Sequence, residues 1–148
     1  NKVDNEENCQ KISEIGLKTN AKILPIYKKC NSKGALNKID PISLNELKEE
    51  LKNIEVLLIV NENPLDYITE DDLNSIKKIV TISYFKNNIV NKSDYVIPGK
   101  PWAFKEGSYT NSVNTNQNFK IAVPDIVNEN LSEIEILMKI SEKLDIDL

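Results

Sequence analysis

Few side chains in the 148-residue sequence could carry out catalysis by themselves. It contains no histidine, which is the commonest general base near neutral pH and the commonest metal ligand in proteins. Cys9 and Cys30 stand far apart and outside any CxxC pair, whereas zinc and iron–sulfur sites need clustered thiolates. We therefore expect no catalytic residue and no metal site in this chain. We interpret the cysteines as reduced, mostly buried thiols, with a disulfide as the alternative.

Charge and hydropathy exclude further classes of site. All 19 basic residues are lysines, and the net charge is −4 with a pI near 5.0, so the guanidinium groups that read phosphates and guanines are missing. The acidic pairs Glu49–Glu50 and Asp71–Asp72 fall in helical patterns, where charge runs usually form solvated faces. No apolar run approaches the ~20 residues that span a bilayer. We expect neither a nucleic-acid partner nor direct membrane insertion.

The polar segment WAFKEGSYTNSVNTNQ, residues 102–117, lies between two apolar stretches and is rich in Asn, Ser and Thr. A long loop of this kind in a compact domain is often functional. It is either a linker or the wall of a cofactor pocket. We expect its tryptophan, Trp102, to pack against the domain edge, with docking of a neighbour as the alternative.

Helical segments are each predicted by a start signal. They span residues 4–18, 43–52, 69–78 and 132–144. The first opens on Asp4, and two others open on capping boxes, which pair Ser43 with Glu46 and Ser132 with Glu135. Such caps contribute roughly 1 kcal/mol each, so they fix boundaries more than they decide the fold.

Short apolar runs between these segments predict strands. They span residues 21–27, 55–60, 78–85, 95–98 and 119–123. The run 55–60 is unbroken and predicts a strand buried on both faces, whereas Pro25 places the run 21–27 at an edge, a bend or a strand end. The alternation predicts an α/β fold with a Rossmann-like, mostly parallel sheet and helices on both faces. A C-terminal loop–strand–helix extension follows, within a single domain over 1–148 that we expect to be a fragment of a larger chain, because it does not begin with methionine.

Ligands of open parallel sheets usually bind at the edge where the strands carry their carboxyl ends. The predicted segments at that edge are KKCNSKGA, NENPLD, YFKNN and PGKPWAFKEG. In the first, Asn31, Lys33 and Gly34 favour a capped turn with a solvated lysine over an anion site, because no P-loop or GxGxxG is present. The second favours a loop that leads into the next helix.

The order of several short motifs resembles one module of the molybdopterin oxidoreductase superfamily. Its members include formate dehydrogenases, nitrate reductases and the large subunit of bacterial respiratory complex I, the NADH–quinone oxidoreductase. The family pattern A-D-V-V-L-P resembles SDYVIP at 93–98, and E-K-E-G-T-x-x-N-x-E-G-R-x-Q resembles KEGS at 105–108 followed by Asn111 and Gln117. ENPL at 62–65 approximates E-x-D-P-L, and CNSKGALNKI at 30–39 is similar to a segment of the large complex I subunit.

One departure from the family bears on the cofactor. The family's E-G-R triplet is Val113-Asn114-Thr115 in this chain. In pterin enzymes this stretch lies by the cofactor, where an arginine suits phosphate or pterin recognition, and Thr115 cannot replace a bidentate guanidinium. The large complex I subunit is the branch without a molybdenum pterin, so the loss favours that branch.

The resemblance also implies which residues would contact a pterin if one is bound. They are Glu106, Gly107, Asn111 and Gln117. Without a pterin, we expect Glu106 and Gly107 to shape a turn with a positive φ at Gly107. Asn111 and Gln117 would then hydrogen-bond to neighbouring backbone.

The favoured interpretation is a non-catalytic structural domain of a protein similar to the large complex I subunit. The resemblance implies that it supports electron transfer from NADH to quinone through iron–sulfur clusters held elsewhere in the parent chain or complex. Its partners would be other domains of that chain and other complex I subunits. It would be cytoplasmic and peripheral to the inner membrane through those subunits.

Two alternatives stay open at this point. In one, the chain is part of an active molybdenum or tungsten pterin oxidoreductase such as a formate dehydrogenase. In the other, it is a free-standing flavodoxin-like or phosphoreceiver module. The second alternative is disfavoured because Pro25, Ile26 and Tyr27 end the first predicted strand, where a receiver would need acids and a flavodoxin a phosphate loop.

Overall fold

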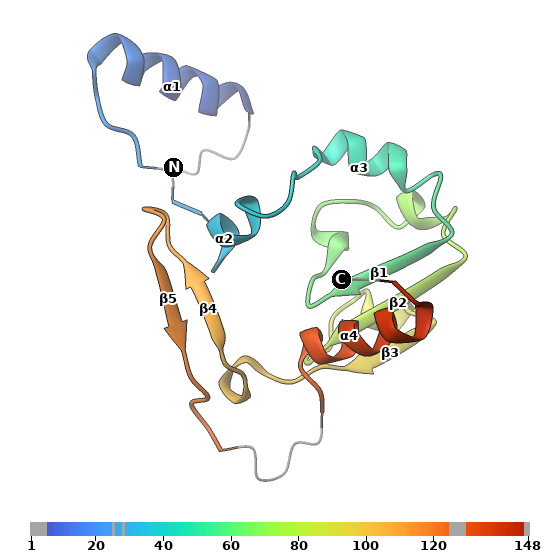
Figure 1. The fold of residues 1–148 in the computed structure, drawn as a ribbon. Coiled ribbons are helices and arrows are strands. Elements are labelled where there is room, and N and C mark those ends of the chain that lie inside the picture. The colour runs from blue at the N-terminus through green and yellow to red at the C-terminus, as the bar shows by residue number, and fades with distance from the viewer. Residues whose placement is uncertain (1–5, 25, 28, 125–129, 147–148) are drawn as a thin grey trace. The chain divides into compact units, whose positions relative to one another are not determined.

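The computed structural model describes residues 6–24, 26–27, 29–124 and 130–146, and it divides into two compact units. The first unit comprises Asn1–Ile39 with Ser108–Asn118, and the second comprises Asp40–Gly107 with Phe119–Leu148. The helices and strands, in chain order, are α1 (Glu6–Thr19), α2 (Ser32–Leu36), α3 (Leu44–Glu50), β1 (Val56–Val60), β2 (Lys78–Ser83), β3 (Tyr95–Pro98), β4 (Gly107–Thr110), β5 (Asn116–Phe119) and α4 (Glu133–Leu144) (Figure 1). A single domain over 1–148 stays a prediction.

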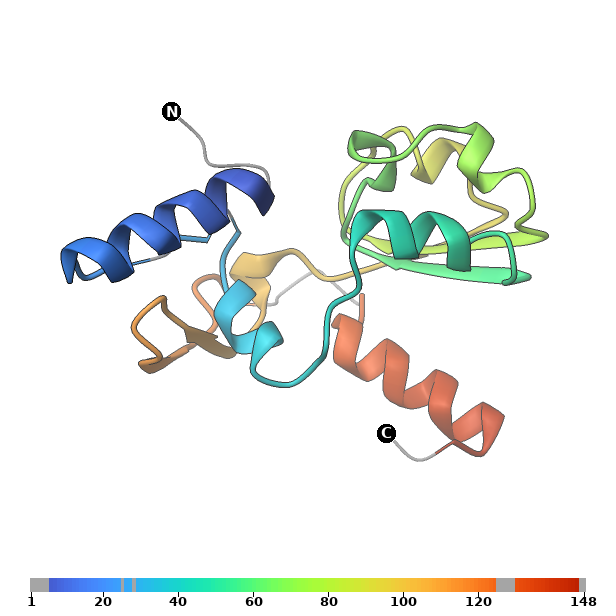
Figure 2. The ribbon, with the colours of Figure 1, turned by 90° about the horizontal axis from the view of Figure 1, so that it is seen from above.

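The second unit is built on a three-stranded sheet with the order β1-β2-β3. Both strand pairs are parallel, with Leu58 opposite Val80 and Ile82 opposite Ile97. The helices α3 and α4 lie on opposite faces of this sheet (Figures 1 and 2). The predicted α/β class with a parallel sheet is therefore confirmed.

The main core lies on the α3 face of the sheet. It is a cluster of buried aliphatic side chains: Leu51, Ile59, Ile68, Leu73, Ile79 and Ile89. On the α4 face, Ile82 is fully buried and Ile136 of α4 is 5% exposed. Because successive side chains along a strand point to opposite faces of the sheet, Ile79 and Ile82 of β2 pack on different faces.

Both predicted capping boxes are present. In α3, the Glu46 N–H donates to Ser43 Oγ and the Ser43 N–H donates back to the Glu46 carboxylate. In α4, Ser132 and Glu135 make the same reciprocal pair. These bonds satisfy backbone donors that the first helical turn cannot pair internally, which explains why both starts are predictable. The predicted start of the first helix at Asp4 lies outside the described residues.

The predicted helix over 69–78 is wrong. The structure has a single 3-10 turn there, Asp71–Leu73, and β2 already begins at Lys78. Asp72 accepts hydrogen bonds from the backbone N–H and hydroxyl of Thr69, so the acids close a turn locally instead of starting a longer helix. The Ser75 hydroxyl then donates to the Leu51 carbonyl at 2.7 Å, which holds this segment against the end of α3.

Two predicted strands are also absent from the described residues. Residues 21–24 and 26–27 have no regular structure, and Ile23, Leu24 and Ile26 are exposed. The run 119–123 is not a strand either, since β5 ends at Phe119 and Ala122 and Val123 instead donate to the Ala103 carbonyl. Apolar residues favour a strand only where a partner strand supplies its hydrogen bonds, and the sequence pattern does not reveal that partner.

The strand β1 differs from its prediction in burial. The sequence pattern predicts burial on both faces, but Val56 is 58% exposed and Leu58 is 40% exposed, while Ile59 lies in the core. One face of β1 packs towards α3, and the other is largely exposed.

The described helices include none long and apolar enough to cross a membrane.

The first unit contains α1, α2 and most of the β4–β5 hairpin. The two strands of the hairpin run in opposite directions, so the polar segment predicted as a loop is largely a hairpin (Figure 1). Asn31 Oδ1 accepts a hydrogen bond from the Thr110 N–H at 2.8 Å, and Asn37 donates to Asn114 Oδ1 at 2.7 Å. These bonds fasten α2 and its flanks to the hairpin.

The core assignment can be tested with Ile82→Ala. We expect this variant to lower the free energy of unfolding by about 2–5 kcal/mol, because it leaves a cavity where a fully buried side chain stood. Urea denaturation followed by circular dichroism measures the change. Ile134→Ala on α4, where the side chain is 69% exposed, is the control and should stay within about 0.5 kcal/mol of wild type. Equal losses in both variants would contradict this core.

Candidate functional site

The carboxyl ends of the parallel strands form one edge of the sheet in the second unit. The residues just beyond the strands are Asn61, Tyr84 and Gly99. Two of them extend the strand ladder, since the Asn61 N–H donates to the Ile82 carbonyl at 2.8 Å and the Gly99 N–H to the Ser83 carbonyl at 3.1 Å. This edge is where open parallel sheets usually bind ligands.

A partly buried ion pair lies at this edge. Lys105 Nζ is 2.8 Å from each carboxylate oxygen of Glu133, the first residue of α4. The side chains of Lys105 and Glu133 are 18% and 15% exposed. Asn61 Nδ2 also donates to Glu133 Oε1, and Lys105 Nζ lies 5.5 Å from the ring centroid of Tyr84. The pair therefore joins α4 to residues that follow β1 and β2.

The surroundings of Glu133 shift its acidity. Burial alone raises the pKa of the Glu133 carboxyl, but hydrogen bonds from Lys105, its own backbone N–H and Asn61 together outweigh it and hold the pKa below its usual value. The carboxylate is thus ionised in the folded chain at neutral pH. An ionised group this far from water is tolerated because its oxygens are hydrogen-bonded.

Gly99 leaves the space that the carboxylate occupies. A Cβ at this position would lie 3.2 Å from Glu133 Oε1 and 3.6 Å from Ile82 Cγ2. Any side chain here would have to displace the carboxylate or the core below it. The glycine is needed for close approach and not for a left-handed backbone, since its φ is not positive.

Two buried amide oxygens at the same edge accept no hydrogen bond from the described residues. They are Asn61 Oδ1 and Asn63 Oδ1. The orientation of both amides is fixed by carboxylates, because Asn61 Nδ2 donates to Glu133 and Asn63 Nδ2 donates to Asp66 at 2.6 Å. Buried acceptors without partners are rare in folded proteins, so these oxygens are candidates for contact with a ligand that carries N–H donors.

The residues predicted to contact a pterin lie along the hairpin. Glu106 and Gly107 are exposed at the start of β4, and Asn111 and Gln117 are exposed further along it. The positive φ expected at Gly107 is wrong, because no described glycine has one. Instead, a Cβ there would lie 3.1 Å from the ring of Phe119, so the glycine makes room for that ring.

Asn111 does bond to neighbouring backbone, as predicted. Its Oδ1 accepts from the N–H groups of Val113 and Thr115 at 3.1 and 2.8 Å and closes the hairpin turn. Asn114 lies in that turn with φ 68°, a conformation that asparagine tolerates better than most residues. The triplet that departs from the family pattern is therefore a self-contained turn.

Other predicted features fall elsewhere. NSKGA follows no strand, and Asn31 makes no capping bond because its side chain bonds to Thr110. Gly34 lies where a Cβ would come within 2.2 Å of Asn31 Oδ1.

Cys9 and Cys30 are free thiols but exposed, which corrects the expected burial. Trp102 is 64% exposed, so the expected packing against the domain edge is not seen.

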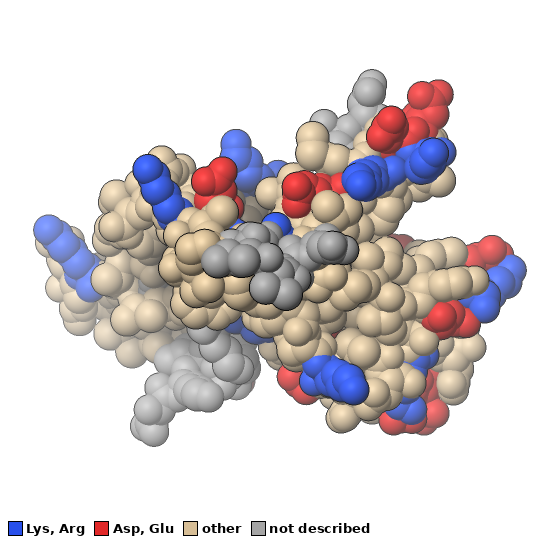
Figure 3. Space-filling model, turned by 90° about the horizontal axis from the view of Figure 1, so that it is seen from below, with Lys and Arg blue, Asp and Glu red and all other residues tan. Residues whose placement is uncertain are grey.

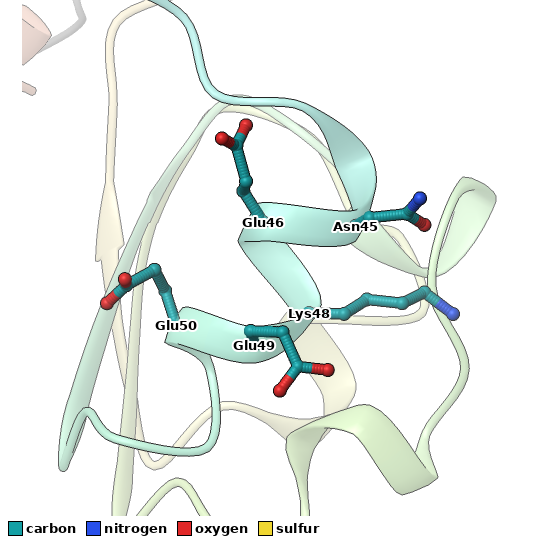
Figure 4. A pocket seen from close by; sticks show the side chains of 5 residues that line it. All are labelled: Asn45, Glu46, Lys48, Glu49 and Glu50. Atoms are coloured by element: carbon teal, nitrogen blue, oxygen red, sulfur yellow. The ribbon is translucent and has the colours of Figure 1, made fainter.

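A hollow lies on α3, but its lining does not make a site. It is lined by Asn45, Glu46, Lys48, Glu49 and Glu50. These side chains come from one short helix and spread around it without converging on one point (Figure 4). On the face drawn in Figure 3, lysines and acids are interspersed, with no broad basic area of the kind that binds nucleic acid.

Sequence reasoning finds part of the edge site. It places NENPLD and PGKPWAFKEG at the edge, and Lys105 belongs to a family motif. It misses Glu133 as the shared hydrogen-bond partner of Lys105 and Asn61. For Glu133, the sequence signal is confined to an acid in the first turn of a capped helix, and such acids are common because they suit the helix dipole.

The second unit has an α/β fold, and its edge site lies where open parallel sheets usually bind ligands. Comparison with known proteins identifies a relative of the chain. No protein-family model matches the chain. The chain is similar to the F420-dependent formate dehydrogenase subunit alpha of Methanocaldococcus jannaschii, with 27% identity over 161 residues. The match covers 97% of this chain and 23% of that protein, so the chain spans about a quarter of its relative's length. This homology supports a domain related to the molybdopterin oxidoreductases, and it does not single out the complex I branch.

The acidity of Glu133 predicts how stability depends on pH. Because its pKa in the folded state is lowered from 4.5, the ionised carboxylate stabilises the fold above that value, and the stabilisation is lost as the pH falls through the folded pKa. We expect Glu133→Gln to lose less stability than wild type between about pH 5 and pH 3. Urea denaturation at each pH measures the two slopes.

Glu142→Gln is the matched control for charge, since Glu142 is exposed on the same helix. It should keep the wild-type slope. Parallel slopes for wild type and Glu133→Gln would show that the Lys105–Glu133 pair does not stabilise the folded chain.

Proposed function

We propose that the chain is a cofactor-facing α/β domain of a molybdenum or tungsten pterin oxidoreductase related to formate dehydrogenases. The observation that carries this proposal is the similarity to the F420-dependent formate dehydrogenase subunit alpha over 97% of the chain. The short motifs at 62–65, 93–98 and 105–108 favour the same superfamily. The catalytic centre of such an enzyme would be completed by parts of the protein outside this chain.

The residues at the sheet edge fit the heterocycle of such a cofactor. A pterin or guanine ring presents amino and ring N–H donors along one side, and Asn61 Oδ1 and Asn63 Oδ1 are buried acceptors without partners in the described chain. Satisfying them would remove the cost of leaving buried polar atoms unpaired. When bound, the pterin-held metal would supply the oxidation chemistry, and Asn61 and Asn63 would bind and orient the ring.

Lys105 has a different part in this proposal. Its ammonium group is already paired with Glu133, so it holds the edge together and is not free to bind a phosphate. The hairpin residues Glu106, Gly107, Asn111 and Gln117 remain a proposal as pterin contacts. Asn111 Oδ1 already closes the turn, so a pterin contact from this side chain would come from its Nδ2 amide group.

A second candidate function is favoured by one observation. The stretch Val113–Thr115 replaces the family's acid, glycine and arginine, and it forms an uncharged turn satisfied by Asn111 and Asn37. This is what a structural domain without a pterin would contain. Such a domain would support electron transfer from NADH to quinone in a protein similar to the large complex I subunit. It would pack against other subunits, with iron–sulfur clusters elsewhere and only peripheral association with the membrane.

The two candidates differ in what the parent protein contains. We expect the intact parent protein, purified natively, to contain molybdenum or tungsten by elemental analysis and a pterin detected by its fluorescent oxidation product. Iron and acid-labile sulfide without either metal or pterin would overturn the first candidate and support the second.

A variant tests the role of the sheet edge in the parent protein. Asn61→Gly removes the Oδ1 acceptor together with the Nδ2 donor to Glu133, and we expect retention of the pterin-bound metal to weaken by at least about fivefold, the size of one lost hydrogen bond. Asn61 has φ 50°, which glycine adopts without strain. Asn20→Gly, at φ 52° after α1, is the matched control and should retain the metal as wild type does. Equal retention in both variants would remove Asn61 from the binding site.

A further inference from the structure

We propose that the sheet edge contains a binding site for a small carboxylate, which Glu133 fills from within the chain. The carboxylate is held by groups from separate segments of the second unit. Lys105 Nζ lies 2.8 Å from both of its oxygens, and Asn61 Nδ2 donates to Oε1. A cation and an amide donor converging on one planar anion is the arrangement that proteins use to bind free carboxylates.

The Lys105–Glu133 pair is less exposed than the Lys48–Asp72 pair, whose side chains are 35% and 22% exposed, and much less exposed than the surface pairs of the helices. The Lys11–Glu7 pair has side chains 64% and 72% exposed, and the Lys52–Glu49 pair has side chains 63% and 72% exposed. Lys105 and Glu133 are 18% and 15% exposed. Exposed pairs hold their geometry weakly, whereas a partly buried lysine without its partner would leave a charge that little water reaches. An anion beside Lys105 therefore stabilises the folded site.

The shape of the site favours a carboxylate over a larger anion. A Cβ on Gly99 would lie 3.2 Å from Glu133 Oε1, so the Gly99 backbone is close to the carboxylate. The Tyr84 ring lies 5.5 Å from Lys105 Nζ. A planar carboxylate has room beside Gly99, and a phosphate, which carries oxygens on all sides of its centre, would need more space there.

The position of Glu133 makes this site self-occupied. It is the first residue of α4, so its carboxylate also meets the positive end of the helix dipole. A carboxylate arriving from outside can bind Lys105 only by displacing the tethered one. The wild-type chain should therefore bind free carboxylates weakly, and a chain lacking the Glu133 carboxylate should bind them well.

Glu133→Ala tests the inference, because it removes the atoms of one acetate ion. We expect acetate to raise the melting temperature of this variant saturably, with an affinity at least about tenfold higher than for wild type. Acetate should also shift the backbone amide resonances of Asn61 and Gly99. The titration uses the 148-residue chain at constant ionic strength, with sodium chloride and phosphate as parallel arms. A phosphate response stronger than the acetate response would overturn the assignment to carboxylates.

Matched variants separate a binding site from general stabilisation. Glu142→Ala removes an exposed carboxylate from the same helix, away from its capping box, and should show no saturable response to acetate. Glu133→Ala combined with Lys105→Met should lose the response. Should Glu133→Ala not fold, Glu133→Ser vacates the same space and keeps a residue suited to a helix start. Absence of a saturable acetate response in a folded Glu133 variant would overturn the proposal.

Discussion

The partly buried carboxylate of Glu133 must be paired, because an ionised group removed from water is costly unless hydrogen bonds compensate it. That requirement links three parts of the second unit. Lys105 belongs to the stretch before the hairpin, Asn61 follows the end of β1, and Glu133 is the first residue of α4. Gly99 belongs to the same constraint, since a side chain there would occupy the space of the carboxylate. The placement of α4 over its face of the sheet thus depends on a polar interaction at the edge as well as on the burial of Ile82 and Ile136.

The same edge bears on function in two ways. Its buried acceptors, Asn61 Oδ1 and Asn63 Oδ1, suit a ligand with N–H donors, while its partly buried cation, Lys105, is already neutralised. The similarity to a formate dehydrogenase alpha subunit supports a relationship to the molybdopterin oxidoreductases, and it favours the enzyme alternative over the complex I interpretation. The replaced triplet at Val113–Thr115 remains the feature that favours a domain without a pterin.

The uncovered apolar surface is consistent with a chain that spans 23% of its relative. Val56 and Leu58 leave one face of β1 exposed, and Ile134 and Met138 are exposed on α4. The sequence pattern of β1, by contrast, predicts a strand buried on both sides.

The sequence by itself determined those features whose partners lie within a few residues. The capping boxes of Ser43 with Glu46 and Ser132 with Glu135 are of this kind, because a cap and its target are three residues apart. The apolar runs of β1, β2 and β3 and the parallel sheet that they form were also predictable, since strands that alternate with helices favour a parallel sheet. Only the tertiary structure decided that residues 21–24, 26–27 and 119–123 are not in strands and that 69–78 holds a single turn. It alone paired Glu133 with Lys105 and Asn61, which lie 28 and 72 positions away. The reason is physical: a strand or a buried charge is stable only with its partner, and periodicity along the chain does not encode which distant residue that partner is.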